Sequence, residues 1–153
     1  EYMMDIAVAV KRKNLATVMV SNGYINIDAA KDIFPLIDAA NIDMKGFSEE
    51  FYSEMTKSTL QPVLDSIIFF HKLGKHLEIT NLIIPGKNDS EKMIKDFLEW
   101  VKAELSPDIP IHFSAYHPDY KFSESPRTPT ALLHRIKDTA VTTGLKHIYL
   151  GNI

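Results

Sequence analysis

An acid and a base stand two residues apart in the stretch Asn41-Ile42-Asp43-Met44-Lys45. On an extended strand, side chains two residues apart point to the same face. An apolar run precedes the pair and a glycine follows it, so Asp43 and Lys45 are predicted to lie together where a strand ends. A lysine ammonium can bind a carboxylate, and an aspartate can bind an ammonium or a pair of hydroxyls. The alternative is a solvated ion pair at a strand edge.

Polar groups also follow or lie within other expected strands. They are Asn22 and Gly23 after the first strand, Thr80 within the third, and His117 after the fourth. The carboxyl ends of parallel strands lie on one side of a sheet, and ligands bind there. We therefore expect these groups to share a concave surface with Asp43 and Lys45, suited to a small zwitterionic ligand. Each residue alone is also explained by a structural role.

The histidines show no metal-binding spacing. No pair matches H-E-x-x-H, and a metal site is not expected. His117 precedes a proline and is predicted to be extended, either as a donor or acid–base group or as a rim residue bonded to the loop. His112 alternates with apolar neighbours and is predicted to pack in the core. The remaining histidines are predicted to be at the surface.

Helical and strand patterns alternate along the chain. Expected helices cover residues 1–14, 28–34, a short segment capped by Ser48, 62–74, a segment capped by 88–90, and a last helix capped by Thr128 and ended by Gly144. Expected strands cover residues 16–20, a segment ending at 43–45, 76–84, 109–116 and 146–150. Residues 121–128 read as a loop.

This alternation predicts an α/β fold with five parallel strands and right-handed crossovers. A closed parallel barrel normally takes about eight strands, so a partial TIM-like barrel is expected, with its first strands missing. The run Leu82-Ile83-Ile84 favours a strand covered on both faces. The helix at residue 1 suggests a piece of a longer protein. The bared edge of strand 16–20 is predicted to be covered by another copy of the chain or by neighbouring molecules.

Composition limits the class of protein. The 153 residues suit a single domain, and a net charge of −3 gives no basic footprint for nucleic acid or an anionic membrane. No apolar run approaches the roughly 20 residues of a membrane span. There is no cysteine, which excludes disulfides, thiolate catalysis and a cysteine-ligated cluster on this chain. The expected location is cytoplasmic.

Five motifs occur in a familiar order: V-S-N-G-Y, I-D-M-K-G-F, I-T-N-L-I-I-P-G-K-N-D-S, H-F-S-A-Y-H-P-D-Y and I-Y-L-G-N. Together they resemble radical S-adenosylmethionine (radical SAM) enzymes of the pyruvate formate-lyase activating type. They look closest to the radical member of the AmmeMemoRadiSam system. The resemblance covers essentially the whole chain.

The resemblance implies a partial (β/α) barrel that holds S-adenosylmethionine and a [4Fe–4S] cluster at the strand carboxyl ends. It implies a 5′-deoxyadenosyl radical that abstracts a hydrogen atom, in the activases from a glycine of a partner protein. By motif, Asp43 and Lys45 match the D-x-K pair that contacts S-adenosylmethionine, and His117 matches a histidine that contacts the same cofactor. Asn22 and Gly23 match a turn that lines the site.

The chain departs from the family in two ways. The CxxxCxxC cluster motif and the G-G-E motif are absent, and Val20-Ser21 stands where the activases carry an acid. The expectation is therefore the C-terminal part of such an enzyme, which cannot bind the cluster and is inactive alone. Two alternatives stay open: a class I aldolase-like enzyme with a Schiff base on Lys45, and a non-catalytic protein-binding domain.

Overall fold

The computed structural model describes residues 1–153 and contains one five-stranded sheet, in which each strand runs parallel to its neighbours. The strands lie in the sheet in the order in which they occur in the chain, as expected when each crossover returns to the adjacent position. Their bounds are β1 (Val18–Ser21), β2 (Ala39–Asp43), β3 (His76–Ile83), β4 (Ile111–Ala115) and β5 (Ile148–Gly151). The sheet does not close, and the predicted partial (β/α) barrel is confirmed.

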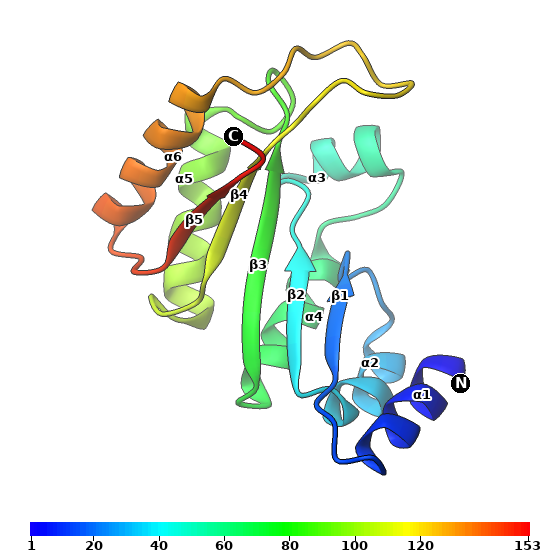
Figure 1. The fold of residues 1–153 in the computed structure, drawn as a ribbon. Coiled ribbons are helices and arrows are strands. Elements are labelled where there is room, and N and C mark those ends of the chain that lie inside the picture. Colours follow the sequence, from blue (N-terminus) through cyan, green and yellow to red (C-terminus); the bar gives the residue numbers. More distant parts are fainter.

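The helices lie on one face of the sheet, with α1 before the first strand and the others in the connections between strands (Figure 1). They are α1 (Tyr2–Lys11), α2 (Ile27–Ile33), α3 (Glu49–Phe51), α4 (Gln61–Lys72), α5 (Glu91–Trp100) and α6 (Thr130–Thr143). A 3₁₀ turn, Phe34–Leu36, extends α2, while π-helical turns follow α3 (Tyr52–Thr56) and α5 (Val101–Leu105). None of these helices combines the length and apolar character that a membrane span requires.

The core lies between the sheet and these helices. Along β3 the buried side chains alternate with half-buried ones, which is the pattern of a strand with one covered face. Ile42, Ile79 and Phe113 are fully buried on the helix side, and Phe97 of α5 meets Phe113 edge-on with ring centroids 6.3 Å apart. The opposite, concave face of the sheet therefore stays open.

Several predicted ends of elements are confirmed. Ser48 accepts a hydrogen bond from the Phe51 N–H as the N-cap of α3, and Ser90 accepts one from the Met93 N–H at the start of α5. Gly144 ends α6 in the left-handed conformation, with φ of 103°.

Two predictions about local structure are wrong. The prediction that both faces of β3 are covered is wrong. Ile83 of β3 is buried against the helices, but Leu82, which points to the opposite face, is half-buried, so the concave face is open. Thr128 does not cap α6, which begins without a side-chain cap. Instead its hydroxyl donates to the Ile83 carbonyl at 2.6 Å and accepts from the Tyr116 N–H at 2.8 Å, so it closes the base of the loop between β4 and α6.

Candidate functional site

The predicted acid–base pair forms at the carboxyl end of β2. Lys45 Nζ lies 2.9 Å from Asp43 Oδ2, and about a third of each side chain is exposed. Asp43 is the last residue of the strand and Lys45 lies two residues after it, and their contact confirms that the two side chains point the same way. Both groups remain reachable by a ligand, and each has hydrogen-bonding capacity that the other leaves unused.

Two side chains, Asn81 and Tyr52, hold the backbone beneath this pair. Asn81, buried on β3, donates from its amide to the Met44 carbonyl. The Tyr52 hydroxyl accepts from the Lys45 N–H at 3.3 Å and donates toward the Met44 sulfur at 3.5 Å. Burial raises the pKa of Tyr52 to about 12, so the hydroxyl stays protonated at neutral pH. The turn that carries Lys45 is thus fixed from below.

Asn88, which the sequence predicted as part of a helix cap, instead holds the turn that carries Lys45. It is 1% exposed, and its side chain makes three hydrogen bonds, none longer than 2.8 Å. The Asn88 amide nitrogen donates to the carbonyls of Lys45 and Leu82, and its oxygen accepts from the Ile84 N–H. The nearby Ser90 does cap α5. No local pattern distinguishes an asparagine that caps from one that bridges two strand ends.

The predicted Asn22-Gly23 turn follows β1. Gly23 has φ of +69°, and a Cβ atom there would lie 2.8 Å from Ile42 Cγ2. The Ser66 hydroxyl of α4 donates to the Gly23 carbonyl at 2.7 Å. Asn22 is exposed, and its oxygen accepts from the Tyr24 N–H at 3.1 Å. Gly23 therefore serves the packing of β1 against α4, and only the Asn22 side chain is open to solvent.

Thr80 lies on the concave face one strand away from Asp43, with which it is in register. Its hydroxyl donates to the Asn41 oxygen at 2.8 Å, and the Asn41 amide lies 3.5 Å from Glu78. The interior of a closed β/α barrel is normally filled by branched apolar side chains. Here the corresponding face carries a connected row of polar groups, which suits contact with water or a polar ligand.

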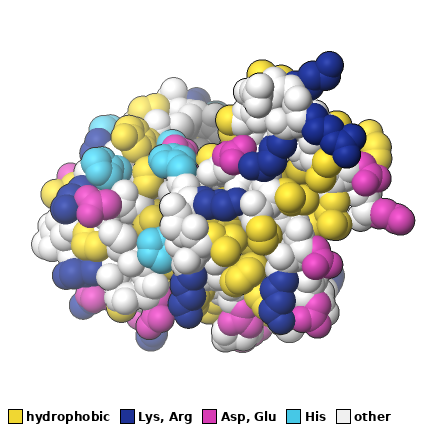
Figure 2. Space-filling model, turned by 90° about the horizontal axis from the view of Figure 1, so that it is seen from below, with side chains coloured by type: hydrophobic (Ala, Val, Ile, Leu, Met, Phe, Trp, Pro, Cys, Tyr) yellow, Lys and Arg dark blue, Asp and Glu magenta, His cyan; other side chains and the backbone are white.

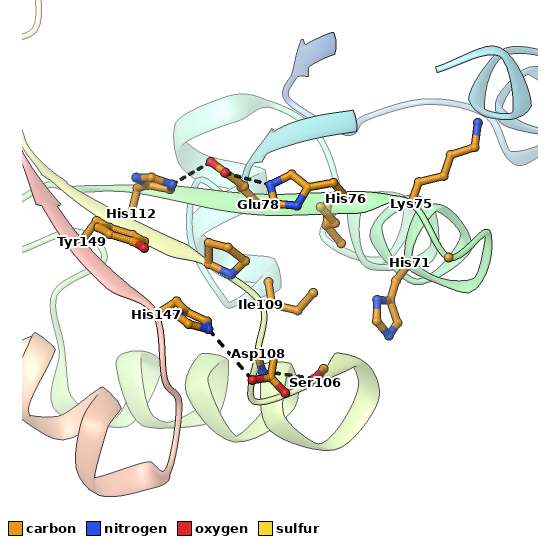
Figure 3. A pocket seen from close by; sticks show the side chains of 13 residues that line it. His71, Lys75, His76, Glu78, Ser106, Asp108, Ile109, His112, His147 and Tyr149 are labelled. Carbon is orange, nitrogen blue, oxygen red and sulfur yellow. Dashed lines mark hydrogen bonds and ion pairs between the residues drawn. The ribbon is translucent and has the colours of Figure 1, made fainter. Parts of the chain in front are cut away.

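Glu78 contacts two imidazoles near the amino ends of the strands (Figure 3). His76 Nε2 lies 2.9 Å from one carboxylate oxygen and His112 Nε2 lies 2.8 Å from the other. The hydrogen bond from His76, and then that from His112, lowers the pKa of Glu78. The prediction that His112 packs in the core is wrong: its ring stacks on Tyr149 at 5.1 Å on the open face, because β4 turns its even-numbered side chains away from the helices.

This cluster borders a cavity of about 610 Å³, which His71, Asp108 and His147 also line. Figure 2, which views the molecule from the strand amino ends, shows the histidines gathered on one side of that surface. No three histidine or carboxylate side chains converge as a metal ion would require. The sequence did not predict that these histidines lie together, because they come from α4, β3, β4 and the residue just before β5.

His117 occupies the same end of the sheet as Asp43 but not the same place. It follows β4, whereas Asp43 ends β2, so β3 lies between them. Its Nε2 lies 3.0 Å from the Asn152 carbonyl oxygen just after β5. Neither Asp43 nor His117 lines the 610 Å³ cavity or the other large one, of about 910 Å³ between α5 and α6. The imidazole lies at the rim, and no hydrogen bond or ion pair joins it to Asp43 or Lys45.

The chain is similar to a known protein in sequence and to several solved structures in fold. No family model matches the chain. An uncharacterized protein of Methanocaldococcus jannaschii is 39% identical over all 153 residues, and the chain spans 45% of that protein's length. A domain of a pyruvate-formate lyase-activating enzyme from Bacteroides vulgatus superposes with a TM-score of 0.85 at 16% identity, over 99% of this chain and 90% of that one.

A second solved structure agrees. A radical SAM methyltransferase from Sphaerobacter thermophilus superposes with a TM-score of 0.72 at 11% identity, over 90% of this chain and 41% of that enzyme. At such identities the likeness concerns the fold. The chain has the partial (β/α) barrel that radical SAM domains have, with Asp43 and Lys45 at the carboxyl ends of its strands.

Proposed function

We propose that this chain is the cofactor-binding part of a radical SAM enzyme, and that it binds S-adenosylmethionine at the carboxyl ends of its strands. The observation that carries the proposal is the Asp43–Lys45 pair, 2.9 Å apart, in a barrel of the radical SAM type. Ligands of parallel α/β folds bind at this end of the sheet. In its finer form, the proposal is that the enzyme is of the pyruvate formate-lyase activating type, which the sequence motifs resemble.

The residues fit the charges of this ligand. The Lys45 ammonium suits the carboxylate of the methionine part, and Asp43 suits its ammonium or the ribose hydroxyls. Asn22 offers an amide just after β1, where Gly23 shapes the turn, and Thr80 offers a hydroxyl on β3. His117 offers an imidazole after β4, on the other side of β3 from the pair. With one electron from a [4Fe–4S] cluster held outside this chain, bound S-adenosylmethionine would supply the abstraction of a hydrogen atom from a substrate.

The residues do not fit an iron–sulfur cluster. Such clusters are held by cysteine thiolates, and the chain has no cysteine. In this proposal the [4Fe–4S] cluster belongs to another part of a longer polypeptide. The M. jannaschii relative is more than twice as long as the region that the chain matches, which leaves room for such a part. The substrate in this proposal is a glycine-bearing partner protein, as in the activating enzymes.

Binding of S-adenosylmethionine and of 5′-deoxyadenosine, measured by isothermal titration calorimetry, tests the proposal. Asp43→Ala, Lys45→Ala and His117→Ala are each expected to weaken binding of S-adenosylmethionine by about tenfold, the loss of roughly one charge-assisted contact. The ion pair between Lys146 and Asp108, 2.8 Å long, provides the matched control at the opposite end of the sheet. Asp108→Ala should leave the affinity unchanged, and equal affinity in all four variants would overturn the site.

The aldolase-like alternative has its own test. If Lys45 forms a Schiff base, borohydride treatment with keto-sugars will fix substrate carbon to that lysine, and Lys45→Arg will abolish the adduct. Under the radical SAM proposal no adduct forms at Lys45. Mass spectrometry of the treated chain separates the two outcomes.

A further inference from the structure

The cavity of about 610 Å³ at the amino ends of the strands has no part in the function proposed above. Asp43, Lys45 and His117 are not among the residues that line it. All of its lining residues lie between positions 71 and 149, on α4, β3, β4 and β5 or beside them. Its volume falls in the range of about 300–1,000 Å³ that is typical of small-molecule sites. The cavity is therefore large enough to be a binding site of its own.

Glu78 is the carboxylate in the cavity wall that has no lysine or arginine partner. The other carboxylate, Asp108, pairs with Lys146 at 2.8 Å. Lys75 also borders the cavity, but its ammonium donates to backbone carbonyls within residues 34–37. Figure 3 shows the Lys75 side chain directed away from Glu78. The cavity therefore presents one negative charge that no lysine or arginine of the chain neutralises.

The groups around Glu78 leave mainly hydrogen-bond acceptors for a ligand. His76 and His112 give their Nε2–H groups to the carboxylate at 2.9 and 2.8 Å, so each imidazole keeps Nδ1 as an acceptor. A carboxylate has about four lone-pair positions, and the two imidazoles with the more distant Asn41 amide do not fill them all. Glu78 can therefore accept a further bond, and the cavity suits a ligand that is cationic and rich in donors.

An aromatic surface lies beside this charge. The Tyr149 ring stacks on His112 with the ring centroids 5.1 Å apart and the planes 21° from parallel. This stack occupies one face of Tyr149, and the residue is still 50% exposed. A guanidinium group is planar, carries several donors in its plane and stacks on aromatic rings, whereas a lysine-type ammonium is a compact point charge. The charge, the acceptors and the ring together favour a guanidinium.

We propose that this cavity binds a guanidinium group, which donates to the Glu78 carboxylate and stacks against Tyr149. The group can belong to a free small molecule such as arginine or to an arginine side chain of a polypeptide, because both present the same chemistry. Binding involves no covalent step. It takes place at the opposite end of the sheet from Asp43 and Lys45, so it is independent of the function proposed above.

Isothermal titration calorimetry of the whole chain with N-acetyl-arginine amide tests the site, at pH 8, above the range in which imidazoles ordinarily titrate. N-acetyl-citrulline amide, which carries a neutral urea in place of the guanidinium, is expected to bind about tenfold more weakly or worse, because the charge-assisted bond is lost. Glu78→Gln should weaken binding of the arginine compound to a similar degree. Glu99→Gln, at an exposed position on α5, is the matched control and should leave the affinity unchanged. No binding of the arginine compound, or equal binding of the citrulline compound, would overturn the proposal.

A second variant keeps the proposal testable if Glu78→Gln fails to fold, which circular dichroism checks. Tyr149→Leu removes the ring and should weaken binding of N-acetyl-arginine amide severalfold, the usual contribution of a cation–π contact. Tyr24→Leu is its control, because Tyr24 is 49% exposed but does not line the cavity. It should bind like the unmodified chain. Folded Tyr149→Leu and Glu78→Gln variants that both bind like the unmodified chain would contradict the site.

Two further comparisons identify the source of the guanidinium and separate this site from the other one. Tighter binding of the peptide acetyl-Gly-Arg-Gly amide than of free arginine assigns the site to a polypeptide, and the reverse order assigns it to a small molecule. Asp43→Ala should leave the affinity for N-acetyl-arginine amide unchanged, and Glu78→Gln should leave that for S-adenosylmethionine unchanged. Loss of arginine binding in Asp43→Ala would show that the cavity is not a separate site and would overturn the proposal.

Discussion

Glu78 shows how single residues shape the concave face. Its carboxylate joins His76 and His112, which lie on different strands, and Asn41 approaches from a third. A carboxylate that accepts from several donors is stabilised in its charged form, which agrees with the lowered pKa of Glu78. Because the carboxylate accepts both bonds, each imidazole presents its Nε2–H to Glu78 and leaves Nδ1 free. The row of polar groups is thus ordered around one negative charge.

The lowered pKa of Glu78 predicts how stability depends on pH. A carboxyl group whose pKa is lowered by folding adds stability above its unfolded pKa, near 4.5, and this stability is lost as pH falls through the folded pKa. Glu78→Gln is therefore expected to lower the free energy of unfolding by about 1 kcal/mol at pH 7. The difference should shrink in the acid range. Urea denaturation at several pH values measures it.

Glu99→Gln is the control for that series, because Glu99 is exposed on α5. Its unfolding free energy should follow that of the unmodified chain at each pH. A Glu78→Gln variant as stable as the Glu99→Gln variant at pH 7 would show that the two histidine contacts contribute nothing.

At the scale of elements, the strand ends are held by side chains from elsewhere in the chain. Asn81 and Asn88 hold the turn after β2, Ser66 of α4 holds the turn after β1, and Thr128 closes the loop after β4. Buried polar groups of this kind need partners, because an unpaired one costs about 1–3 kcal/mol. The rim that carries the candidate site is therefore rigid at its base.

Gly23 is a test of the contact between β1 and α4. Gly23→Ala is expected to destabilise the fold by about 1–2 kcal/mol for the left-handed backbone, with about 1–3 kcal/mol more for the close approach to Ile42. Gly74→Ala is the matched control, with φ of +68° and no atom near the added methyl. Thermal denaturation compares the two. Equal costs would mean that the space around Gly23 relaxes freely.

Asn88→Ala tests whether the base of the turn positions Lys45. Loss of three buried hydrogen bonds is expected to destabilise the chain by about 2 kcal/mol or more and to weaken binding of S-adenosylmethionine without any contact to it. Asn26→Ala removes the N-cap of α2 and should cost about 1 kcal/mol while binding persists. Calorimetric titration of both folded variants makes the comparison. Unchanged affinity in Asn88→Ala would remove its positioning role.

At the scale of the whole molecule, the arc of five parallel strands has two distinct surfaces. Helices bury one face, while the concave face is polar toward β3 and β4 and apolar toward β1. The solved domain from B. vulgatus has nearly the same extent, since the superposition covers 90% of it. An open arc of this size thus occurs as a separate domain in a solved structure.

The lack of cysteine predicts the behaviour of the whole chain toward iron. Anaerobic incubation with iron and sulfide is expected to leave no bound cluster, because no thiolate is present to hold it. Absorption spectra and iron analysis after gel filtration measure this. Stoichiometric iron and sulfide on the folded chain would contradict the proposal that the cluster belongs to another part of a longer polypeptide.

Much of the fold could be predicted because its signals are local. Alternating strand and helix patterns, the Ser48 and Ser90 caps and Gly144 each depend on a few neighbouring residues. The same holds for Asp43 and Lys45, whose shared direction follows from the geometry of a strand. Predictions failed where distant residues decide: His112 faces Glu78 from another strand, and Thr128 bonds to β3 instead of capping α6.

The sequence by itself determined the order of strands and helices, the acid–base pair and the inability to hold a cluster through cysteine. Only the tertiary structure decided which face of the sheet is open, which histidines meet, and how far His117 lies from the pair in the strand order. The physical reason is that backbone periodicity and side-chain chemistry act over a few residues. Burial and hydrogen bonding between strands depend on neighbours that the fold alone brings together.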